Sequence, residues 1–395
     1  MLNAWLKLVA LVVAVMLPQA GDEAASGLSP GRDVAPGVRH FVLTDSTLLD
    51  PPGPITIHML RLDLAQVELT TDLSLGNRQG RATVLSAALR RHAIAAVNAG
   101  FFNLTNGDPV GPLRVDGELV SDGTLGRGAA ALAGDVRGRE AWLFDRASVS
   151  VSVVIDPGGQ SIAVDGVDTT RSIGALMVYT PRYGPTSDTA PTGIEWVLTH
   201  GPGASGTSYV VTERRWHVGK TPIPKDGAVL SYGGLMPPAP LDKLGAGDRV
   251  TLRETWAAGS AEATERWRGA SDVVSGAGLL RRRGADVTDW QPEHLSTTFF
   301  GRHPRTMFGL DRAGYAWLVT VDGRQPDESD GMSLVELQKL ARRIGLTDAL
   351  NLDGGGSTTM VILGNVVNRP SDPTGARTVS DVLLVVPRMT RPGAR

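Results

Sequence analysis

The chain has 395 residues, 42% of them hydrophobic, and its 39 basic and 41 acidic residues give a formal net charge of −2. This length and apolar content are enough for a sizeable core, and the balanced charge excludes the basic surface typical of nucleic-acid-binding proteins. Cysteine is absent, which excludes disulfides, thiol catalysis and thiolate metal sites. The 48 glycines and 25 prolines, with only 5% aromatic residues, are typical of a turn-rich β protein.

The first residues have the pattern of an export signal. Lys7 precedes an apolar run over residues 8–17, which is followed by "PQA" and small residues. Ten apolar residues are too few to span a bilayer but suit the core of a signal peptide. We therefore predict a signal peptide over residues 1–25, a secreted or envelope-associated protein, and no membrane span in the mature chain. A buried N-terminal helix is the alternative.

The folded part is expected to begin with strands. The segments "HFVLTDS", "ITIHMLRLDL" and "VELTTDLS" alternate apolar and polar residues, as half-buried strands do. Residues 83–92 have the apolar spacing of a helix, and "AIAAVNAGFFN" is expected to be a buried strand that continues into a loop. Residues 111–159 and 170–256 predict short strands separated by Gly, Pro and Asp turns, without helix signals.

After residue 256 the sequence predicts a single helix. "SLVELQKLARRIG" places its apolar residues near one face, Ser333 and Glu336 form a capping-box pattern, and Gly345 is a suitable stop. The pattern as a whole predicts an α+β fold of mixed or antiparallel sheets with a few packed helices, in one large domain over residues 36–388. Residues 140–270 could form a β-rich subdomain within it.

The glycine-rich stretch "LDGGGST" follows this helix and a short strand that ends in Asp353. Consecutive glycines can turn the backbone and point several N–H groups into a concavity that binds an anion. The alternative is a tight turn between buried strands, capped by Asp353. No lysine follows the glycines, so the phosphate loop of nucleotide triphosphatases does not match.

Two further clusters contain polar residues that suit a ligand. Arg305 in "GRHPRTMFG" and Arg324 in "LVTVDGRQ" are fork-shaped donors for a phosphate, and Asp322 ends an apolar strand as Asp353 does. In "AAVNAGFFN", asparagines flank a glycine and two aromatic residues that could line a sugar site. The alternatives are a hairpin turn with solvated ion pairs in the first cluster and core aromatics in the second. His303 could act as a proton shuttle or have a structural role.

These motifs, in this order and together with "VVSGAGLLRRRG", resemble the phosphodiester glycosidase family over roughly residues 92–386. Position by position, the resemblance implies a catalytic group of Asp353, Asp322 and Arg305. The substrate-binding residues that it implies are Asn98, Gly100, Phe101, Thr306, Gly323, Arg324, Asn351, Gly354, Gly355, Gly356 and Ser357. The chain lacks the cysteines and the extra carboxyl-terminal modules of the family's animal members, so the aglycone stays open.

The resemblance implies hydrolysis of a sugar, of the N-acetylglucosamine type, from a glycosyl-1-phosphodiester such as a phosphoglycan. Asp353 or Asp322 would be the nucleophile or base, the arginines would bind the phosphate, and Asn98, Phe101 and Asn351 would orient the sugar. A non-catalytic protein that binds cell-wall phosphoglycans is one alternative. The other is a phosphodiesterase that releases sugar-1-phosphate, a reaction that usually needs a metal pair with His and Asp ligands.

No cofactor is expected, and the sequence assigns neither a metal nor an oligomeric state. A divalent cation such as calcium could bind hard oxygen ligands, although no EF-hand loop is present. The candidate ligands are Asp322, Asp327, Asp330 and Asp353.

Overall fold

The computed structural model describes residues 30–134, 140–201 and 207–388, so the predicted signal peptide lies outside the described residues. Strands dominate these ranges, and no helix in them is long and apolar enough to cross a membrane. The three α-helices are α2 (Val84–Arg90), α3 (Ala261–Arg268) and α4 (Leu334–Arg343). The expected α+β class therefore holds only coarsely, because sheets make up most of the described fold.

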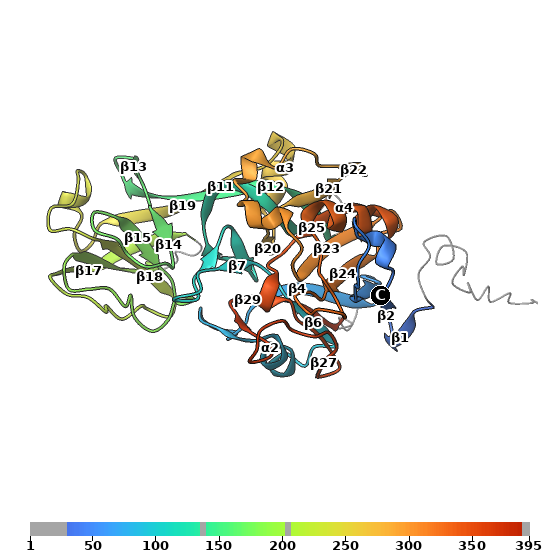
Figure 1. The fold of residues 1–395 in the computed structure, drawn as a ribbon. Helices are drawn as coiled ribbons and strands as arrows, with labels where there is room; N and C mark the ends of the chain where they lie inside the picture. Colours follow the sequence, from blue (N-terminus) through green and yellow to red (C-terminus); the bar gives the residue numbers. More distant parts are fainter. Residues whose placement is uncertain (1–29, 135–139, 202–206, 389–395) are drawn as a thin grey trace, which may run out of the picture.

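Two antiparallel sheets form the centre of the molecule (Figure 1). The eight-stranded sheet has the order β1 (Arg32–Ala35), β2 (Val38–Leu43), β3 (Ile57–Leu62), β24 (Ala316–Val321), β23 (Arg305–Asp311), β25 (Leu346–Asn351), β21 (Leu279–Arg282) and β22 (Ala285–Asp286). The five-stranded sheet has the order β27 (Asn365–Val366), β26 (Met360–Ile362), β6 (Ala95–Asn98), β29 (Asp381–Pro387) and β4 (Val67–Leu73).

The alternation of side chains along these strands explains why the two sheets stack. On β3, Leu60 and Leu62 point into a core shared with the five-stranded sheet, whereas Met59 points to the opposite face under α4. On the far side of the five-stranded sheet, Ala96 and Leu384 pack against α2. The result is a layered body in the order α4, eight-stranded sheet, five-stranded sheet, α2.

A third, twelve-stranded sheet extends from this body into a β-rich lobe, drawn in green and yellow in Figure 1. Strand β13 (Gln160–Ala163) pairs with β12 at the side of this sheet. The other strands follow one another in the order β10 (Glu118–Ser121), β9 (Leu113–Val115), β20 (Asp272–Ser275), β11 (Gly123–Gly134), β12 (Glu140–Asp156), β19 (Arg249–Ala257), β17 (Ser208–Trp216), β16 (Ile194–Thr199), β18 (Gly227–Tyr232), β15 (Leu176–Tyr179) and β14 (Gly166–Val167). The lobe has its own core, which includes Trp196, Leu230 and Val250. The subdomain boundaries 140–270 stay a prediction, because β12 and β19 run on from the layered body.

Two short ribbons complete the strands: β5 (Ala82–Thr83) pairs with β28 (Thr378–Val379), and β7 (Phe101–Phe102) pairs with β8 (Pro109–Val110). The 3-10 helices are η1 (Ser46–Leu48), η2 (Leu241–Lys243), η3 (Gln291–Glu293), η4 (Thr297–Phe300) and η5 (Gly355–Ser357).

The helix expected near residues 333–345 is confirmed as α4. Ser333 Oγ accepts a hydrogen bond from the Glu336 amide, and the Glu336 carboxylate accepts one from the Ser333 amide at 2.9 Å. Helix α2 confirms the expectation at 83–92, but α3 contradicts the expectation of a single later helix. Trp267 is the one buried residue of α3, so its sequence carries almost no apolar periodicity.

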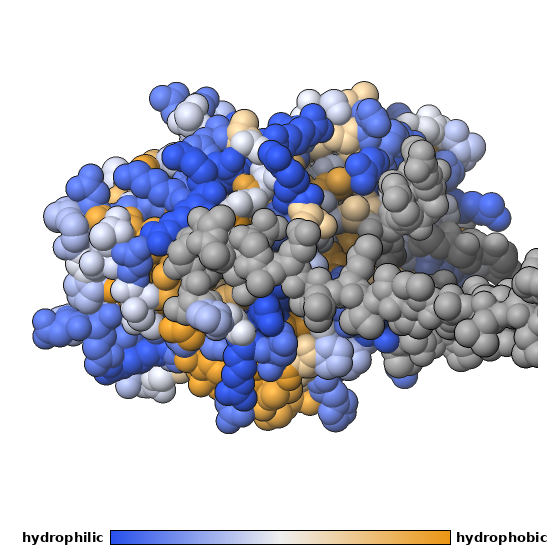
Figure 2. Space-filling model, turned by 90° about the vertical axis from the view of Figure 1, so that its right-hand side faces the viewer, coloured by the Kyte–Doolittle hydropathy of each residue, from blue (hydrophilic) through white to orange (hydrophobic). Residues whose placement is uncertain are grey.

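Helix α2 also leaves apolar surface uncovered. Leu89 on α2 and Leu363 beyond β26 are each 56% exposed. Figure 2 shows orange, hydrophobic surface along the lower edge of the molecule, at the height where α2 and β27 lie in Figure 1. This surface lies on the outside of the α2 layer, so it takes no part in the polar site described next.

Candidate active site

Asp353 lies directly after β25, where the two stacked sheets meet. Its amide donates a hydrogen bond to Ala99 O at 2.9 Å, and its carbonyl accepts one from Asn98 Nδ2 at 2.7 Å. The other end of the Asn98 side chain accepts hydrogen bonds from Thr306 Oγ1 at 2.7 Å and from the Thr359 amide at 3.1 Å. Asn98 and Thr306 are fully buried, so they anchor the glycine-rich loop rather than face a ligand.

The Asp353 carboxyl is only partly exposed, and it accepts a hydrogen bond from the Gly354 amide at 2.9 Å. Burial raises its pKa to about 6, although the Ser357 hydroxyl, the Gly354 amide and the charge of Arg377 act in the opposite direction. A carboxyl with this pKa can hold or lose a proton near neutral pH, which is what a catalytic acid, base or nucleophile requires.

A second buried carboxyl, Asp381 at the start of β29, lies beside the same turn. Its Oδ2 accepts a hydrogen bond from the Gly100 amide at 2.8 Å, and its Oδ1 is buried without a partner in the described structure. Burial, together with the negative charge of Asp353, raises the pKa of Asp381 to about 7. A Cβ on Gly100 would lie 2.9 Å from Asp381 Oδ2, so this position favours glycine.

Asp381 was not among the site residues predicted from the sequence. It stands at the head of the apolar strand "SDVLLVVP", where an acidic residue resembles an ordinary strand end. One signal in the sequence could have pointed to Asp381: it is a carboxylate next to a run of apolar residues. A carboxylate in such a place must be neutral, paired or functional.

The three glycines after Asp353 serve close packing more than anion binding. Two of their amides are used internally: that of Gly354 by the Asp353 carboxylate, and that of Gly355 by Pro304 O at 2.9 Å. A Cβ on Gly354 would lie 2.5 Å from Pro304 O, and one on Gly355 would lie 3.0 Å from Arg324 Nη2. A Cβ on Gly356 would collide with the Asp372 carboxylate. The expected concavity of free amides is therefore largely filled by the protein's own groups.

A group of cationic and imidazole side chains lies next to this loop. Arg324 leans on Gly355, is exposed, and has its Nε and Nη2 at 3.4 and 3.3 Å from His303 Nδ1. Desolvation, followed by the charges of Arg324 and Arg305, lowers the pKa of His303 and favours its neutral form. In the described parts of the chain, neither Arg324 nor Arg305 forms an ion pair with a carboxylate. The negative charge of Glu336 acts on Arg305 but forms no ion pair with it, so the excess of positive charge makes this a place for an anion.

Arg305 is only 5% exposed and is held by backbone carbonyls. Its Nε donates to Met332 O at 2.7 Å, and its Nη2 donates to Phe299 O at 2.6 Å and to Gly301 O at 3.0 Å. Desolvation, followed by the charge of Arg324, lowers its pKa to about 10. Arg305 thus stays charged at neutral pH and has little freedom to move.

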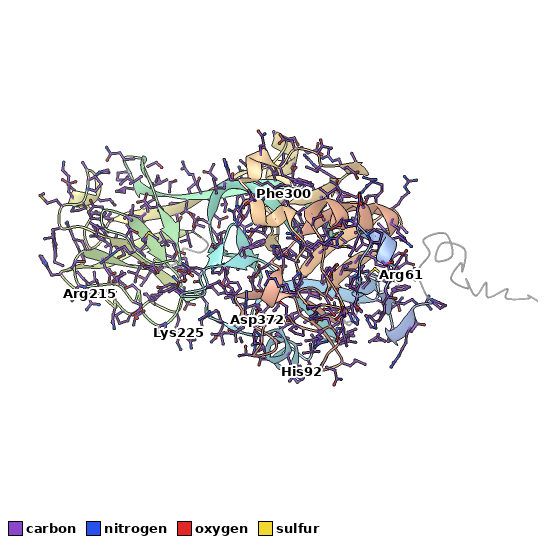
Figure 3. The ribbon with its side chains drawn as sticks, viewed as in Figure 1. Arg61, His92, Arg215, Lys225, Phe300 and Asp372 are labelled. Atoms are coloured by element: carbon purple, nitrogen blue, oxygen red, sulfur yellow. The ribbon has the colours of Figure 1, made fainter. Side chains whose placement is uncertain are left out.

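Aromatic side chains border the cationic group. The rings of Phe101 and Phe299 have centroids 5.7 Å apart, and the Arg305 guanidinium carbon lies 5.9 Å from the Phe299 ring. Both phenylalanines are partly exposed. In Figure 3, Phe300 and Asp372 are labelled on the side of the layered body that faces the β-rich lobe. Phe101 therefore borders the cationic group through Phe299, and its contact with a substrate stays a prediction.

The remaining predicted residues have structural contacts. Asp322 is buried, and its carboxylate accepts hydrogen bonds from Asn368 Nδ2 at 2.9 Å and from the Arg369 amide at 3.0 Å. Burial raises its pKa, while these two donors lower it. Asp322 therefore orders the loop at residues 368–369. No hydrogen bond in the described structure links it to Asp353.

Gly323, Asn351 and Ser357 are also buried. A Cβ on Gly323 would lie 2.8 Å from Pro304 N, and Asn351 Nδ2 donates to Ala277 O at 2.7 Å. Ser357 is close enough to lower the pKa of Asp353. These buried residues support the segments around Asp353, and Ser357 also favours the ionised form of Asp353.

Metal ligands are not grouped in the described part of the chain. No set of three or more His, Cys, Asp or Glu residues there is arranged to hold an ion. Of the four aspartates considered for calcium, Asp330 lies 3.5 Å from Arg302 and Asp322 binds the 368–369 loop. The expectation that no cofactor is required, with a calcium ion as the open alternative, stays a prediction.

Residues 205–386 match the family model for phosphodiester glycosidase, which confirms the resemblance indicated by the sequence. The matched range contains Asp353, Asp381, Arg305 and Arg324, but not Asn98 or Phe101. The matched part of the chain is therefore similar to phosphodiester glycosidases.

Among individual proteins, the chain is 41% identical over 68 residues to N-acetylglucosamine-1-phosphodiester alpha-N-acetylglucosaminidase of Mus musculus, a match covering 17% of this chain and 13% of the mouse protein. A protein of Burkholderia pseudomallei K96243 has a similar fold, with a TM-score of 0.70 and 25% identity over 85% of this chain and 74% of that one. A protein of Synechocystis shares the fold with a TM-score of 0.74 and 24% identity over 91% of this chain and 64% of that one. The match to the mouse enzyme spans only a small part of that enzyme's length.

Proposed function

We propose that the chain hydrolyses a glycosyl-1-phosphodiester at the anomeric carbon, giving free sugar and a phosphomonoester. The observation that carries this proposal is the position of Arg324, which leans on Gly355 two residues after Asp353 and whose charge acts on Arg305. Neither arginine forms an ion pair in the described structure. Such a site pairs a carboxylate that can react at an oxocarbenium-like carbon with positive charge for a departing phosphate.

The chemistry of the leaving group fits these residues. A phosphomonoester is a weak base, so it departs from the sugar without strong help from a general acid. As the bond breaks, negative charge grows on the phosphate oxygens, and Arg305 and Arg324 stabilise that charge. Since Arg305 is fixed by three backbone carbonyls, it needs little reorganisation during the reaction.

The two carboxyls have different tasks in this proposal. Asp353 is partly exposed and can reach a substrate, so it serves as nucleophile or base, and burial raises its pKa to about 6. Asp381 has a pKa of about 7, its Oδ1 is buried, and its Oδ2 accepts a hydrogen bond from the Gly100 amide. It is a positioning residue that keeps the remaining proton, because two adjacent carboxylates resist ionising together.

The finer identity of the substrate rests on similarity. The mouse relative acts by its name on an N-acetylglucosamine-1-phosphodiester, and Phe101 and Phe299 offer apolar surface for a sugar ring. We propose an N-acetylglucosamine-type sugar on a phosphoglycan. We also propose export to the cell surface or medium, on the basis of the apolar run at residues 8–17.

The decisive experiment follows an α-N-acetylglucosamine-1-phosphate methyl diester in oxygen-18 water. Label in the free sugar with wild type, and loss of turnover in Asp353→Asn, would support cleavage at the anomeric carbon. Asp242→Asn, an exposed aspartate of the β-rich lobe, is the matched control and should keep wild-type turnover. Label in the phosphate would mean a phosphodiesterase, and binding without turnover would mean a glycan-binding protein.

A further inference from the structure

A cavity of about 700 Å³ lies between the β7–β8 hairpin and the β-rich lobe, outside the site described above. One wall is formed by residues 78–80 and by Asn106 and Asp108 of the hairpin loop. The opposite wall is formed by the lobe, mainly Arg171, Tyr179, Tyr183 and residues 184–190. None of these residues has a role in the proposed hydrolysis.

The hairpin wall presents a carboxylate oxygen that is not used by the protein. Asp108 is 8% exposed, and its Oδ2 accepts hydrogen bonds from Asn106 Nδ2 at 2.7 Å and Thr169 Oγ1 at 2.9 Å. Its Oδ1 accepts none of the hydrogen bonds found in the described structure, and it is not among the buried atoms without a partner. A ligand hydroxyl in the cavity can therefore donate to it.

The lobe wall presents an aromatic surface. The ring of Tyr183 packs on the ring of Tyr179 with centroids 4.7 Å apart, and Tyr179 is fixed because its hydroxyl donates to Thr169 O at 3.0 Å. Tyr183 is partly exposed, whereas Tyr179 is fully buried. A firmly backed aromatic ring opposite a hydrogen-bonding carboxylate suits a sugar, which has apolar C–H faces and hydroxyl edges.

The cationic rim adds a preference for phosphate. Arg78 is exposed at the cavity and forms no ion pair in the described structure. Arg171 lies deeper and is already engaged by Ser231 Oγ and Ala190 O, so it supports the wall. A phosphate on the sugar would meet Arg78 at the cavity mouth.

The same hairpin also borders the candidate active site. Phe101 begins β7 beside Phe299 and Arg305, and Asn103 N donates to Asp108 O at 2.9 Å across the loop. Two steps of extended chain, roughly 7 Å, lead from Phe101 to Asn103 at the start of the loop whose Asn106 and Asp108 line the cavity. The hairpin thus connects the two places, and the proposal is that a substrate longer than one sugar spans them.

We propose that this cavity is a second saccharide subsite, which holds a sugar-phosphate unit of the aglycone and selects phosphoglycans over small diesters. The identity of the ligand rests on the proposed function, whereas the existence of the subsite does not. Tyr183 supplies the stacking surface, Asp108 the acceptor for sugar hydroxyls, and Arg78 the charge for the linking phosphate.

The test compares two substrates of different length. One is the methyl diester of N-acetylglucosamine-1-phosphate, and the other is a trimer of N-acetylglucosamine joined through 1-phosphodiesters. Tyr183→Ala should lower kcat/KM for the trimer about tenfold, the size of one lost aromatic contact, and leave the methyl diester unchanged. Tyr315→Ala, a partly buried tyrosine next to Arg61 on the eight-stranded sheet, is the matched control and should spare both substrates.

Asp108→Asn provides the second variant. It keeps the acceptor for Asn106 and Thr169 but turns the oxygen that faces the cavity into an amide donor, so only the trimer should suffer. Equal losses on both substrates would overturn the proposal, because they would show a general distortion of the hairpin. Unchanged trimer kinetics in both variants would also overturn it.

A binding measurement separates this proposal from the proposed reaction. The Asp353→Asn protein should bind the trimer, and adding Tyr183→Ala should raise the Kd about tenfold. If wild type turns over neither substrate, the proposed function fails, but this difference in Kd still supports the subsite. If the two Kd values are equal, the subsite proposal fails whatever the enzyme hydrolyses.

Discussion

Asp381 Oδ2 accepts a hydrogen bond from the Gly100 amide at 2.8 Å, and this contact holds a buried carboxyl beside the turn that also carries Asp353. The amide favours the ionised form of Asp381, but burial and the charge of Asp353 outweigh it and raise the pKa of Asp381 to about 7. The pair therefore holds one proton over the pH range in which Asp353 has already lost its own.

Replacing Asp381 should change the pH profile of the reaction. In wild type, kcat/KM should rise with pH near 6 as Asp353 ionises, and change again near 7 as Asp381 loses its proton. Asp381→Asn keeps an acceptor for Gly100 and removes the second titration, so only the step near 6 should remain. The measurement is kcat/KM from pH 4 to 9. A second step that persists in the variant would assign that titration to another group.

The Asp381 carboxyl should lower the stability of the fold as the pH rises. The pKa of an unperturbed aspartate is 3.8 and that of buried Asp381 is about 7, a difference of about three pH units or roughly 4 kcal/mol. Because the folded-state pKa is raised, the folded state binds the proton more tightly. This contribution to stability is thus fully present below about pH 4 and is lost as pH rises through 7. Relative to wild type, Asp381→Asn should gain unfolding free energy between pH 4 and 8 in urea titrations. Parallel curves for the two proteins would contradict this.

Gly355 should be needed for activity more than for stability. Its φ is +59°, and a Cβ there would lie 3.0 Å from Arg324 Nη2. Gly355→Ala should displace Arg324 and lower kcat/KM at least tenfold, on top of about 1–2 kcal/mol of left-handed strain. Gly345 has a φ of +78° with open space at its Cβ, so Gly345→Ala bears the same strain without touching the site. Equal activity of the two variants would argue against a role for Arg324.

Arg324 should bind the phosphate and hold down the pKa of His303. Arg324→Gln removes a charge that lowers this pKa, so the His303 pKa should rise, as measured by NMR titration of its ring protons. Inhibition by inorganic phosphate should weaken in the same variant. Arg312→Gln, an exposed arginine in the β23–β24 turn, is the control and should leave both readouts unchanged. A His303 pKa that stays at its wild-type value would place Arg324 too far away to act.

Much of the fold could be predicted because its signals are local. Alternation predicted the strands near residues 40–73, and the pair Ser333 and Glu336 predicted the start of α4. The site was harder. Asp322 and Asp353 both end an apolar strand and both precede glycine, so the sequence could not separate them. Their difference arises from distant partners, since Asp322 is bound by the Arg369 amide, 47 residues further along the chain.

The glycine stretch shows the same limit. The sequence predicted that Gly354, Gly355 and Gly356 either form an anion-binding concavity or turn the chain between buried strands. It could not show that Pro304, Arg324 and Asp372 are their close neighbours, because these come from three other segments. Asp381 was missed for a related reason: only the sheet order places β29 beside β6, and with it Gly100.

Asn98 has a consequence for how the site can move. One carboxamide joins Asp353, Thr306 and Thr359, so it ties both stacked sheets to the floor of the glycine loop. The backbone that carries Asp353 is therefore held in place and has little freedom to move. Any closing motion would involve Arg324, which is exposed and has His303 as its side-chain contact. The two sides of the site thus differ: the backbone beside the acid is anchored by Asn98, whereas the exposed cation Arg324 is held, in the described structure, only by its contact with His303.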